Sequence, residues 1–103
     1  MASTPEGKVK KKVVAQLQKL NVYYFYPVTS GYGSSGVPDI VGCYRGRFFA
    51  IECKANGNKP TVLQTMNLNK IEGCGGVALV IDEANVADVT KFLNAMTYED
   101  KNG

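Results

Sequence analysis

The stretch GVPDIVGCYRGRFFAIECK, residues 36–54, constrains the fold of this chain more than any other segment. It contains two apolar runs on either side of an Arg-Gly pair at 45–46, and runs placed around such a short turn predict a β-hairpin. A hairpin that serves only a hydrophobic core has little use for charges, yet the two runs contain Asp39, Glu52 and Lys54. These three side chains are therefore either surface residues or parts of a functional site.

The length of the turn determines which residues of the hairpin face one another. If residues 45–46 form a two-residue turn, Asp39 lies directly opposite Glu52. Opposed residues of an antiparallel pair share a face, with Cβ atoms roughly 4.5–5.5 Å apart. Strand alternation adds Lys54 to the same face. A three-residue turn would instead move Asp39 to the other face of the hairpin.

Two carboxylates that lie so close together repel each other and destabilise a sheet, and a divalent cation between them removes the repulsion. The chain has no His, and its three Cys residues form no CxxC pair, so we do not expect a zinc site. Carboxylate ligands favour Mg²⁺ or Mn²⁺. The alternative is an ordinary surface hairpin in which Lys54 neutralises one of the carboxylates.

The whole chain predicts a single α/β domain over residues 1–103, with loose termini at 1–5 and 98–103. Hydrophobic periodicity and turn signals predict the order α-β-β-β-α-β-α. The expected elements are a helix to about residue 20, a strand at 22–28, the hairpin at 37–54, a helix to about 72, a strand at 77–82 and a helix from 85 to 95 or 96. We expect the strand at 77–82 to be covered on both faces, because it is a continuous apolar run.

Two capping boxes mark the expected helix starts, Ser3 with Glu6 and Thr61 with Gln64. At about 100° per residue, Glu6 falls on the apolar stripe of the first helix, so its carboxylate is expected to point along the buried side. Capping alone would account for both Glu6 and Gln64, and a functional role is the alternative for each.

The net charge of +3 is mildly basic, and the positive charge is concentrated in the first helix at Lys8, Lys10, Lys11 and Lys12. Such a run is either a solvated helix face or a contact surface for nucleic acid. The sequence contains no apolar segment of membrane-spanning length and no hydrophobic signal region. We therefore expect a cytoplasmic protein without a membrane partner, whose cysteines serve as small buried hydrophobes.

Pro38-Asp39, followed after twelve residues by Glu52-Cys53-Lys54, has the form PD…(D/E)xK. Together with the preceding Gly-Val pair, an early Glu in the first helix and a Gln one loop later, the pattern resembles the virus-type replication-repair nuclease (VRR-NUC) domain. This domain belongs to the PD-(D/E)xK restriction-endonuclease-like superfamily, and the chain resembles a small stand-alone member of phage type. The resemblance extends from Glu6 to Asp82.

The resemblance implies a restriction-endonuclease-like core, in which helices flank a mixed sheet. It also implies a set of site residues, namely Asp39, Glu52 and the backbone carbonyl of Cys53 as metal ligands, Glu6 as a further acidic ligand, Lys54 as the catalytic lysine and Gln64 as an accessory residue. The implied activity is that of a Mg²⁺- or Mn²⁺-dependent, structure-selective DNA endonuclease similar to Holliday-junction resolvases. Such an enzyme would act as a homodimer without a small-molecule cofactor, in the host cytoplasm if it is phage-encoded.

DNA contacts are expected from Lys8, Lys10, Lys11, Lys12, Lys59, Ser35 and Gly36, with Arg45 or Arg47 as further candidates. Three alternatives stay open. They are a nuclease that acts on flaps or other DNA structures, a non-catalytic module that binds branched DNA with the same fold, and a structural or interaction protein.

Overall fold

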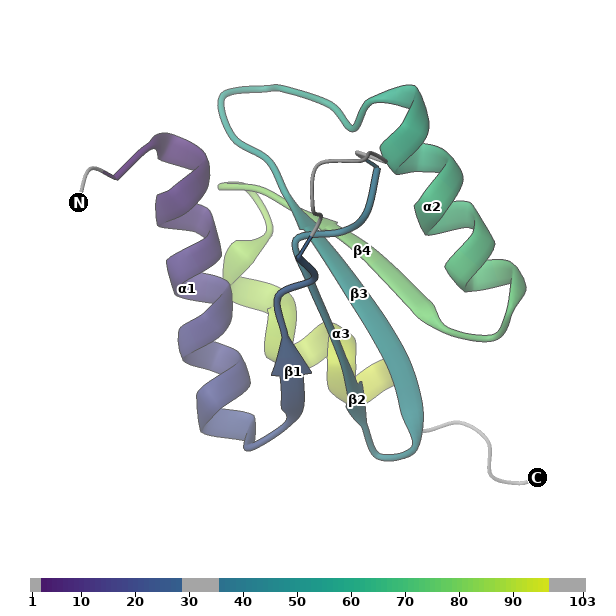
Figure 1. The fold of residues 1–103 in the computed structure, drawn as a ribbon. Helices are drawn as coiled ribbons and strands as arrows, with labels where there is room; N and C mark the ends of the chain where they lie inside the picture. The colour runs from purple at the N-terminus through teal and green to yellow at the C-terminus, as the bar shows by residue number, and fades with distance from the viewer. Residues whose placement is uncertain (1–2, 29–35, 97–103) are drawn as a thin grey trace.

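The computed structural model describes residues 3–28 and 36–96, and Figure 1 shows their arrangement. The elements are α1 (Pro5–Leu20), β1 (Tyr23–Phe25), β2 (Ile40–Tyr44), β3 (Arg47–Cys53), α2 (Val62–Gly73), β4 (Val77–Ile81), the short 3₁₀ helix η1 (Val86–Asp88) and α3 (Val89–Met96). This order confirms the predicted α-β-β-β-α-β-α succession, to which the structure adds η1.

The four strands form one mixed sheet in the order β1-β2-β3-β4. The pairs β1–β2 and β2–β3 are antiparallel, whereas β3 and β4 are parallel and are connected through α2. Figure 1 shows α1 beside the β1 end of the sheet, α2 beside the β4 end and α3 behind the strands. The protein is therefore an α/β domain in which helices flank a mixed sheet.

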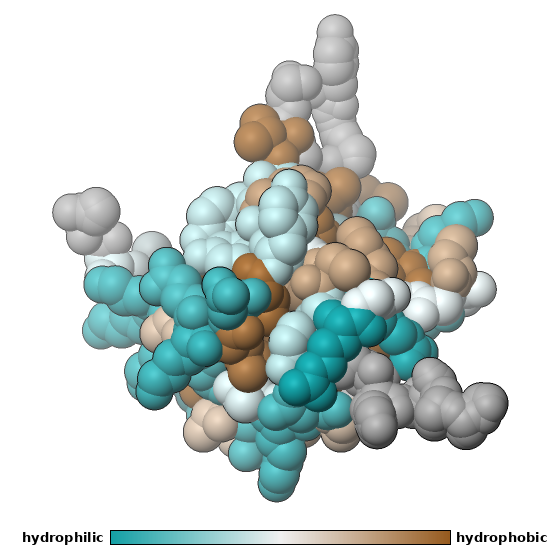
Figure 2. All heavy atoms as spheres, turned by 90° about the horizontal axis from the view of Figure 1, so that it is seen from below, coloured by the Kyte–Doolittle hydropathy of each residue, from teal (hydrophilic) through white to brown (hydrophobic). Residues whose placement is uncertain are grey.

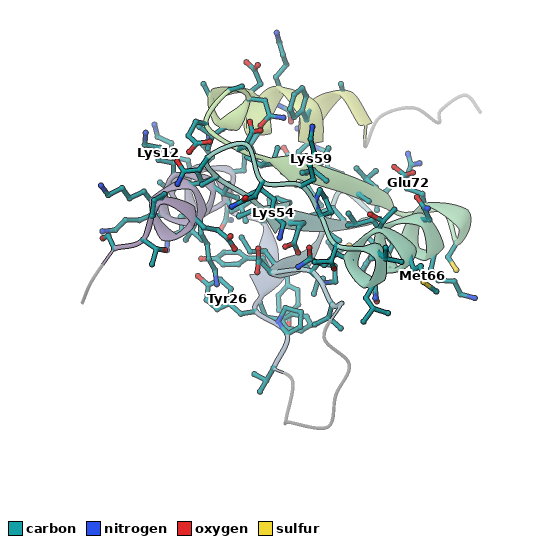
Figure 3. The ribbon with its side chains drawn as sticks, turned by 90° about the horizontal axis from the view of Figure 1, so that it is seen from above. Lys12, Tyr26, Lys54, Lys59, Met66 and Glu72 are labelled. Atoms are coloured by element: carbon teal, nitrogen blue, oxygen red, sulfur yellow. The ribbon has the colours of Figure 1, made fainter. Side chains whose placement is uncertain are left out.

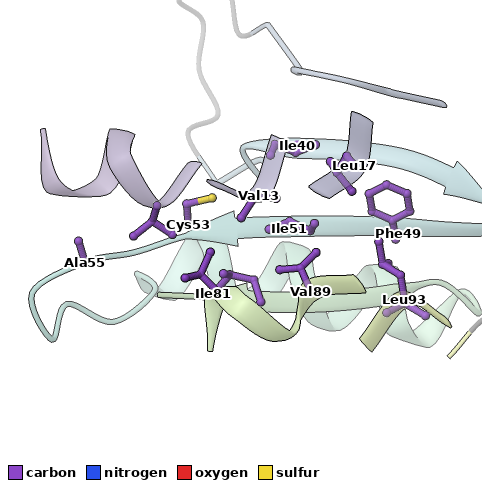
Figure 4. Packing of buried hydrophobic residues seen from close by; sticks show 13 residues of the cluster. Val13, Leu17, Ile40, Phe49, Ile51, Cys53, Ala55, Ile81, Val89 and Leu93 are labelled. Atoms are coloured by element: carbon purple, nitrogen blue, oxygen red, sulfur yellow. The ribbon is translucent and has the colours of Figure 1, made fainter. Parts of the chain in front are cut away.

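One face of the sheet packs against α1 and α3 to form the core. The apolar stripe of α1 is buried there with odd-numbered residues of β3, as Figure 4 shows for Val13, Leu17, Phe49 and Ile51. Gln16 links the helices by polar contacts, since its Nε2 donates to the Val86 carbonyl (2.6 Å) and its Oε1 accepts from a backbone N–H of α3 (2.9 Å). Strand alternation turns the even-numbered residues of β3, including Glu52, to the opposite face.

The N-terminus of α1 corrects one prediction. The helix begins at Pro5, so the N-cap is Thr4 and not Ser3, and Thr4 Oγ1 accepts a hydrogen bond from the Gly7 N–H (2.9 Å). Residues 4 and 5, which we expected in a loose terminal segment, belong to the cap and the first turn of α1, while residues 1 and 2 lie outside the described part of the chain. Residues 98–103 lie outside the described part of the chain.

The strands and cysteines correct further predictions. β1 is shorter than expected, since it pairs with β2 only from Tyr23 to Phe25 and Pro27 has no N–H to donate. α2 packs against β4 but leaves Val80 exposed, so this strand is covered on one face and only partly on the other. Cys53 is buried as predicted, but Cys43 and Cys74 are exposed because one lies on the outer face of the hairpin and the other at the end of α2.

Several hydrophobic side chains lie at the surface of the protein. On the face viewed from below, Figure 2 shows hydrophobic side chains between hydrophilic ones. The strand register places exposed Tyr23 and Phe48 in one row with Cys43 across β1, β2 and β3. Among the described residues, no helix is both long and apolar enough to cross a membrane.

Candidate metal centre

The hairpin register brings Asp39 opposite Glu52. Tyr44 pairs with Arg47 and the ladder continues to Ile40 with Ile51, so the turn has two residues, as predicted. Arg45 and Gly46 have φ angles of 54° and 82°, and positive φ at both positions is what a type I′ hairpin turn requires. Continuing the register by one pair sets Asp39 across from Glu52.

Three carboxylates converge at this end of the sheet. One oxygen each from Glu6, Asp39 and Glu52 lies within 4.8 Å of the others. The residues come from the first turn of α1, the segment before β2 and the end of β3. Glu52 is buried and the other two are half-buried, so the predicted orientation of Glu6 along the buried side of α1 is confirmed.

Lys54 and the backbone of Cys53 complete the surroundings of the carboxylates. Lys54 is 9% exposed, and its Nζ lies 3.4 Å from Glu52 Oε2. The Cys53 N–H donates to Asp39 Oδ2 (2.8 Å), which fixes the orientation of that carboxylate. Because the N–H and C=O of a strand residue point to the same side, we expect the Cys53 carbonyl on the Asp39 side of β3 as well.

Burial shapes the electrostatics of Glu52. Loss of solvation and, to a smaller extent, the nearby Asp39 raise the pKa of Glu52, Lys54 offsets part of this shift, and the resulting pKa is about 7. Burial also raises the pKa of the Cys53 thiol to about 12, so this sulfur stays protonated and is a poor metal ligand. Repulsion among the carboxylates is thus only partly relieved by Lys54.

The donor set fits a hard divalent cation. Glu52 Oε1 is buried and has no hydrogen-bond partner among the residues that the structure describes. A buried carboxylate oxygen without a partner is rare and calls for an explanation. Carboxylate oxygens with a nearby backbone carbonyl are the ligand types that Mg²⁺ and Mn²⁺ prefer.

A hollow of about 450 Å³ lies beside these carboxylates, between the first turns of α1 and the loop after β3. Its lining consists of Thr4, Pro5, Glu6, Gly7, Lys10, Asp39, Ala55, Asn56 and Asn58. The hollow thus combines two of the carboxylates with one lysine and two amide side chains. Its size is sufficient for part of a ligand to approach the carboxylates.

The structure separates the four lysines of α1. Lys10 lies one helical turn after Glu6, is half-buried and lines the hollow. The other three are exposed, and Figure 3 shows Lys12 on the outer side of α1. Of this predicted group, Lys10 therefore lines the hollow together with Glu6, because residues four apart share a helix face.

The remaining predicted DNA contacts lie in different places. Lys59 is exposed on the loop after β3 (Figure 3), and Ser35 lies outside the described residues. Gly36 is buried, and a Cβ added to it would lie 2.6 Å from the Leu63 carbonyl oxygen, so close packing against α2 accounts for this glycine. Arg47 lies at the far end of the hairpin, where its Nε donates to the Gly75 carbonyl (3.0 Å).

Gln64 occupies the predicted capping box at the start of α2. Its Oε1 accepts from the Thr61 N–H (2.9 Å), while the Thr61 hydroxyl accepts from the Gln64 N–H (3.2 Å). Both bonds of the box are present. Capping therefore accounts for this residue, and its accessory role at the metal centre stays a prediction.

Sequence reasoning missed several residues that surround the hollow. Thr4, Asn56 and Asn58 line it, and Tyr26 contacts Lys10 at its margin. The signal for the two asparagines was present, since the ANGN loop follows directly after Lys54. The position of Tyr26 depends on how α1 packs beside β1, which local sequence patterns do not reveal.

Comparison with known proteins gives a weak similarity over most of the chain. No protein-family model matches the sequence. The chain is similar to a protein named "Putative nuclease p44" from Acyrthosiphon pisum secondary endosymbiont phage 1, with 28% identity over 90 residues. The aligned region covers 86% of this chain and 95% of the phage protein.

Proposed function

We propose that the protein is a nuclease that hydrolyses phosphodiester bonds in DNA with the help of Mg²⁺ or Mn²⁺. The observation that carries this proposal is the convergence of three carboxylates beside a buried lysine, with one oxygen of each within 4.8 Å of the others. The similarity to the phage protein named as a nuclease supports the same class of activity. The mixed sheet with flanking helices is compatible with the restriction-endonuclease-like core of the VRR-NUC domain.

In this proposal, Asp39, Glu52, Glu6 and the Cys53 carbonyl hold the metal ion. Bound there, the ion supplies Lewis acidity toward a phosphate oxygen and lowers the pKa of a bound water. The Cys53 N–H holds Asp39 in its liganding orientation. Lys54, anchored beside Glu52, orients the attacking water or stabilises negative charge on the phosphate.

The proposed substrate is branched DNA, such as a Holliday junction, cut by a homodimer in the cytoplasm of the host cell. Support comes from the resemblance to VRR-NUC domains and from the net charge of +3. Light scattering would test the dimer, which should have twice the 11.1 kDa mass of one chain. A nuclease that acts on flaps is the alternative for the substrate.

A non-catalytic module that binds branched DNA is the second candidate function. It would have no need for a buried lysine against a buried carboxylate at a cluster of acidic groups, because binding of the DNA backbone requires only exposed cations. The observed burial of Glu52 and Lys54 therefore favours the enzyme.

The test is incubation of the protein with labelled four-way junction, flap and linear duplex DNA in Mg²⁺, Mn²⁺ or EDTA. We expect cutting with either metal and none in EDTA. Lys54→Ala should abolish cutting and leave junction affinity within about a few fold, since its charge acts mainly on the reacting phosphate. Lys70→Ala, at an exposed lysine of α2, is the matched control and should cut normally. Failure to cut any of the three DNAs with either metal would refute the nuclease.

A further inference from the structure

Tyr26 is an exposed aromatic residue held in a defined position directly after β1. The residue is 46% exposed, and Lys10 Nζ lies 4.5 Å from the centroid of its ring. The ring of Tyr24 contacts it edge-on, with centroids 6.0 Å apart and an interplanar angle of 66°. The ring is thus supported from two sides, while nearly half of the residue remains accessible.

The position of this ring relates it to the candidate metal centre. Lys10 lines the same hollow as Glu6 and Asp39, so its contact with Tyr26 places the ring at the margin of that hollow. Figure 3 shows Tyr26 beside α1. Lys10 therefore connects the Tyr26 ring to the hollow that Glu6 and Asp39 line.

Tyr23 provides an internal comparison on the same strand. It is 70% exposed, and its ring neighbour is Phe25 at 6.2 Å. Alternation along β1 puts these two residues on the face opposite to Tyr24 and Tyr26. Tyr23 pairs with Cys43 toward the hairpin turn, whereas Tyr26 contacts Lys10, so two exposed tyrosines three residues apart have different surroundings.

We propose that Tyr26 and Lys10 form a binding site for the nucleotide adjacent to the scissile phosphate. This inference rests on the proposed nuclease function. The base stacks on the Tyr26 ring, and the Lys10 ammonium turns from the ring to the phosphate of that nucleotide. Proteins that bind single strands use this combination of aromatic rings and cations, and stacking of this kind tolerates every base because each has a π-face.

The inference identifies the class of substrate. In a duplex, the faces of each base are covered by its neighbours, so a protein ring can stack on a base only when that base leaves the stack. The substrate should therefore carry at least one unpaired nucleotide next to the cut, as at a flap, a gap or an open branch point. Continuous duplex DNA should be a poor substrate.

The experiment uses duplexes in which the nucleotide next to the cut site is an unpaired 2-aminopurine, whose fluorescence falls when it stacks. Binding is measured in EDTA, so that no DNA is cut. We expect quenching with the wild type and with Tyr26→Phe, and little with Tyr26→Leu. Loss of one stacked base should weaken binding by about five- to one-hundred-fold. Tyr23→Leu is the matched control and should quench like the wild type.

Two further comparisons separate stacking on the ring from contact with phosphate. An abasic unpaired nucleotide should remove the difference in affinity between the wild type and Tyr26→Leu. Lys10→Gln should weaken binding to the normal and abasic substrates by the same factor, because its contact is with the phosphate. If Tyr26→Leu lowered affinity equally for both substrates, the ring would have a structural role and the stacking site would be refuted.

The outcomes also distinguish this site from the nuclease itself. Cutting by the wild type without quenching of 2-aminopurine would refute the stacking site and leave the nuclease intact. Quenching that depends on Tyr26, without cutting in either metal, would support the stacking site and refute the nuclease. If Tyr26→Leu does not fold, the abasic comparison on the wild type decides, because a stacking site predicts tighter binding of the normal nucleotide.

Discussion

At the scale of single residues, Glu52 is a buried carboxylate in an electrostatically unfavourable position. Its side chain is buried, one carboxylate oxygen has no hydrogen-bond partner among the described residues, and Asp39 lies across the hairpin from it. Lys54 pairs with the other carboxylate oxygen but only partly offsets the effect of burial on the Glu52 pKa. A buried carboxylate of this kind lowers the stability of the folded protein unless a metal ion binds beside it.

The raised pKa of Glu52 predicts how the stability of the metal-free protein depends on pH. The pKa of Glu52 rises from 4.5 to about 7 on folding, so between these values the folded state keeps a proton that the unfolded state has lost. The contribution of Glu52 to stability is therefore full below about pH 4.5, falls as pH rises to about 7 and is constant above. The total change is about 3 kcal/mol. Urea unfolding in EDTA across this range measures it.

Glu52→Gln isolates this contribution from those of other groups. The variant cannot ionise at position 52, so its stability should exceed that of the wild type by a margin that grows from pH 4.5 to 7. Glu72→Gln removes an exposed carboxylate on α2, labelled in Figure 3, and should stay within about 0.5 kcal/mol of the wild type throughout. A margin for Glu52→Gln that does not change with pH would contradict the prediction.

At the scale of elements, the turn of the β2–β3 hairpin sets the geometry of the candidate metal centre. Side chains alternate along each strand, so one extra residue in the turn would move Asp39 to the face opposite Glu52. The register therefore has a direct effect on cation binding. The same argument does not apply to Glu6, which α1 contributes independently of the hairpin.

Insertion of one Gly after Gly46 should abolish the stabilisation of the protein by Mg²⁺ at pH 8. In the wild type, a Mg²⁺ concentration 100-fold above the dissociation constant should add about 2.7 kcal/mol. Arg45→Asn is the control, since Asn suits the positive φ of this position and keeps the turn length. It should retain the full Mg²⁺ response in thermal unfolding. A normal Mg²⁺ response in the insertion variant would show that metal binding does not depend on the hairpin register.

The start of α2 offers a test of the two roles of Gln64. Thr61→Ala and Gln64→Ala each remove one bond of the capping box, and each should lower stability by about 0.5–2 kcal/mol. Because we propose an accessory role for Gln64 as well, Gln64→Ala should reduce the rate of DNA cutting more than Thr61→Ala does. Rates are compared at a temperature where both variants are folded. Equal rates would leave capping as the whole role of Gln64.

At the scale of the whole molecule, the lysines of α1 divide into two groups. Lys8, Lys11 and Lys12 are exposed, whereas Lys10 faces the hollow. In the proposed nuclease, the exposed group would attract DNA through long-range charge, while Lys10 would contact one phosphate. Substitutions in the two groups should therefore differ in how they change DNA affinity and its dependence on salt concentration.

Replacement of Lys8, Lys11 and Lys12 together by Gln should weaken DNA binding and reduce the slope of log affinity against log salt. Each phosphate contact that is lost lowers the slope for duplex DNA by about 0.9. Lys10→Gln alone should change the slope by no more than the value for one phosphate contact, about 0.9. Titrations at several salt concentrations measure both. An unchanged slope in the triple variant would identify those residues as an ordinary solvated face.

The sequence alone determined the features that depend on local rules. The apolar stripe of α1 and the Thr61–Gln64 capping box follow from residue spacing. Strand alternation paired Asp39 with Glu52 on the condition of a two-residue turn, and the structure shows that turn. Local rules were less reliable at ends and edges. Thr4 replaces Ser3 as the N-cap, because the position of the cap depends on where the helix starts.

Only the tertiary structure decided what gathers around the paired carboxylates. The packing of α1 and α3 on the sheet brings Glu6 to Asp39 and Glu52, sets Lys10 apart from its neighbours and places Tyr26 against it. These contacts join residues far apart in the chain, so their geometry depends on how whole elements pack. The burial that raises the pKa of Glu52 has the same origin, since no single segment can remove a side chain from water by itself.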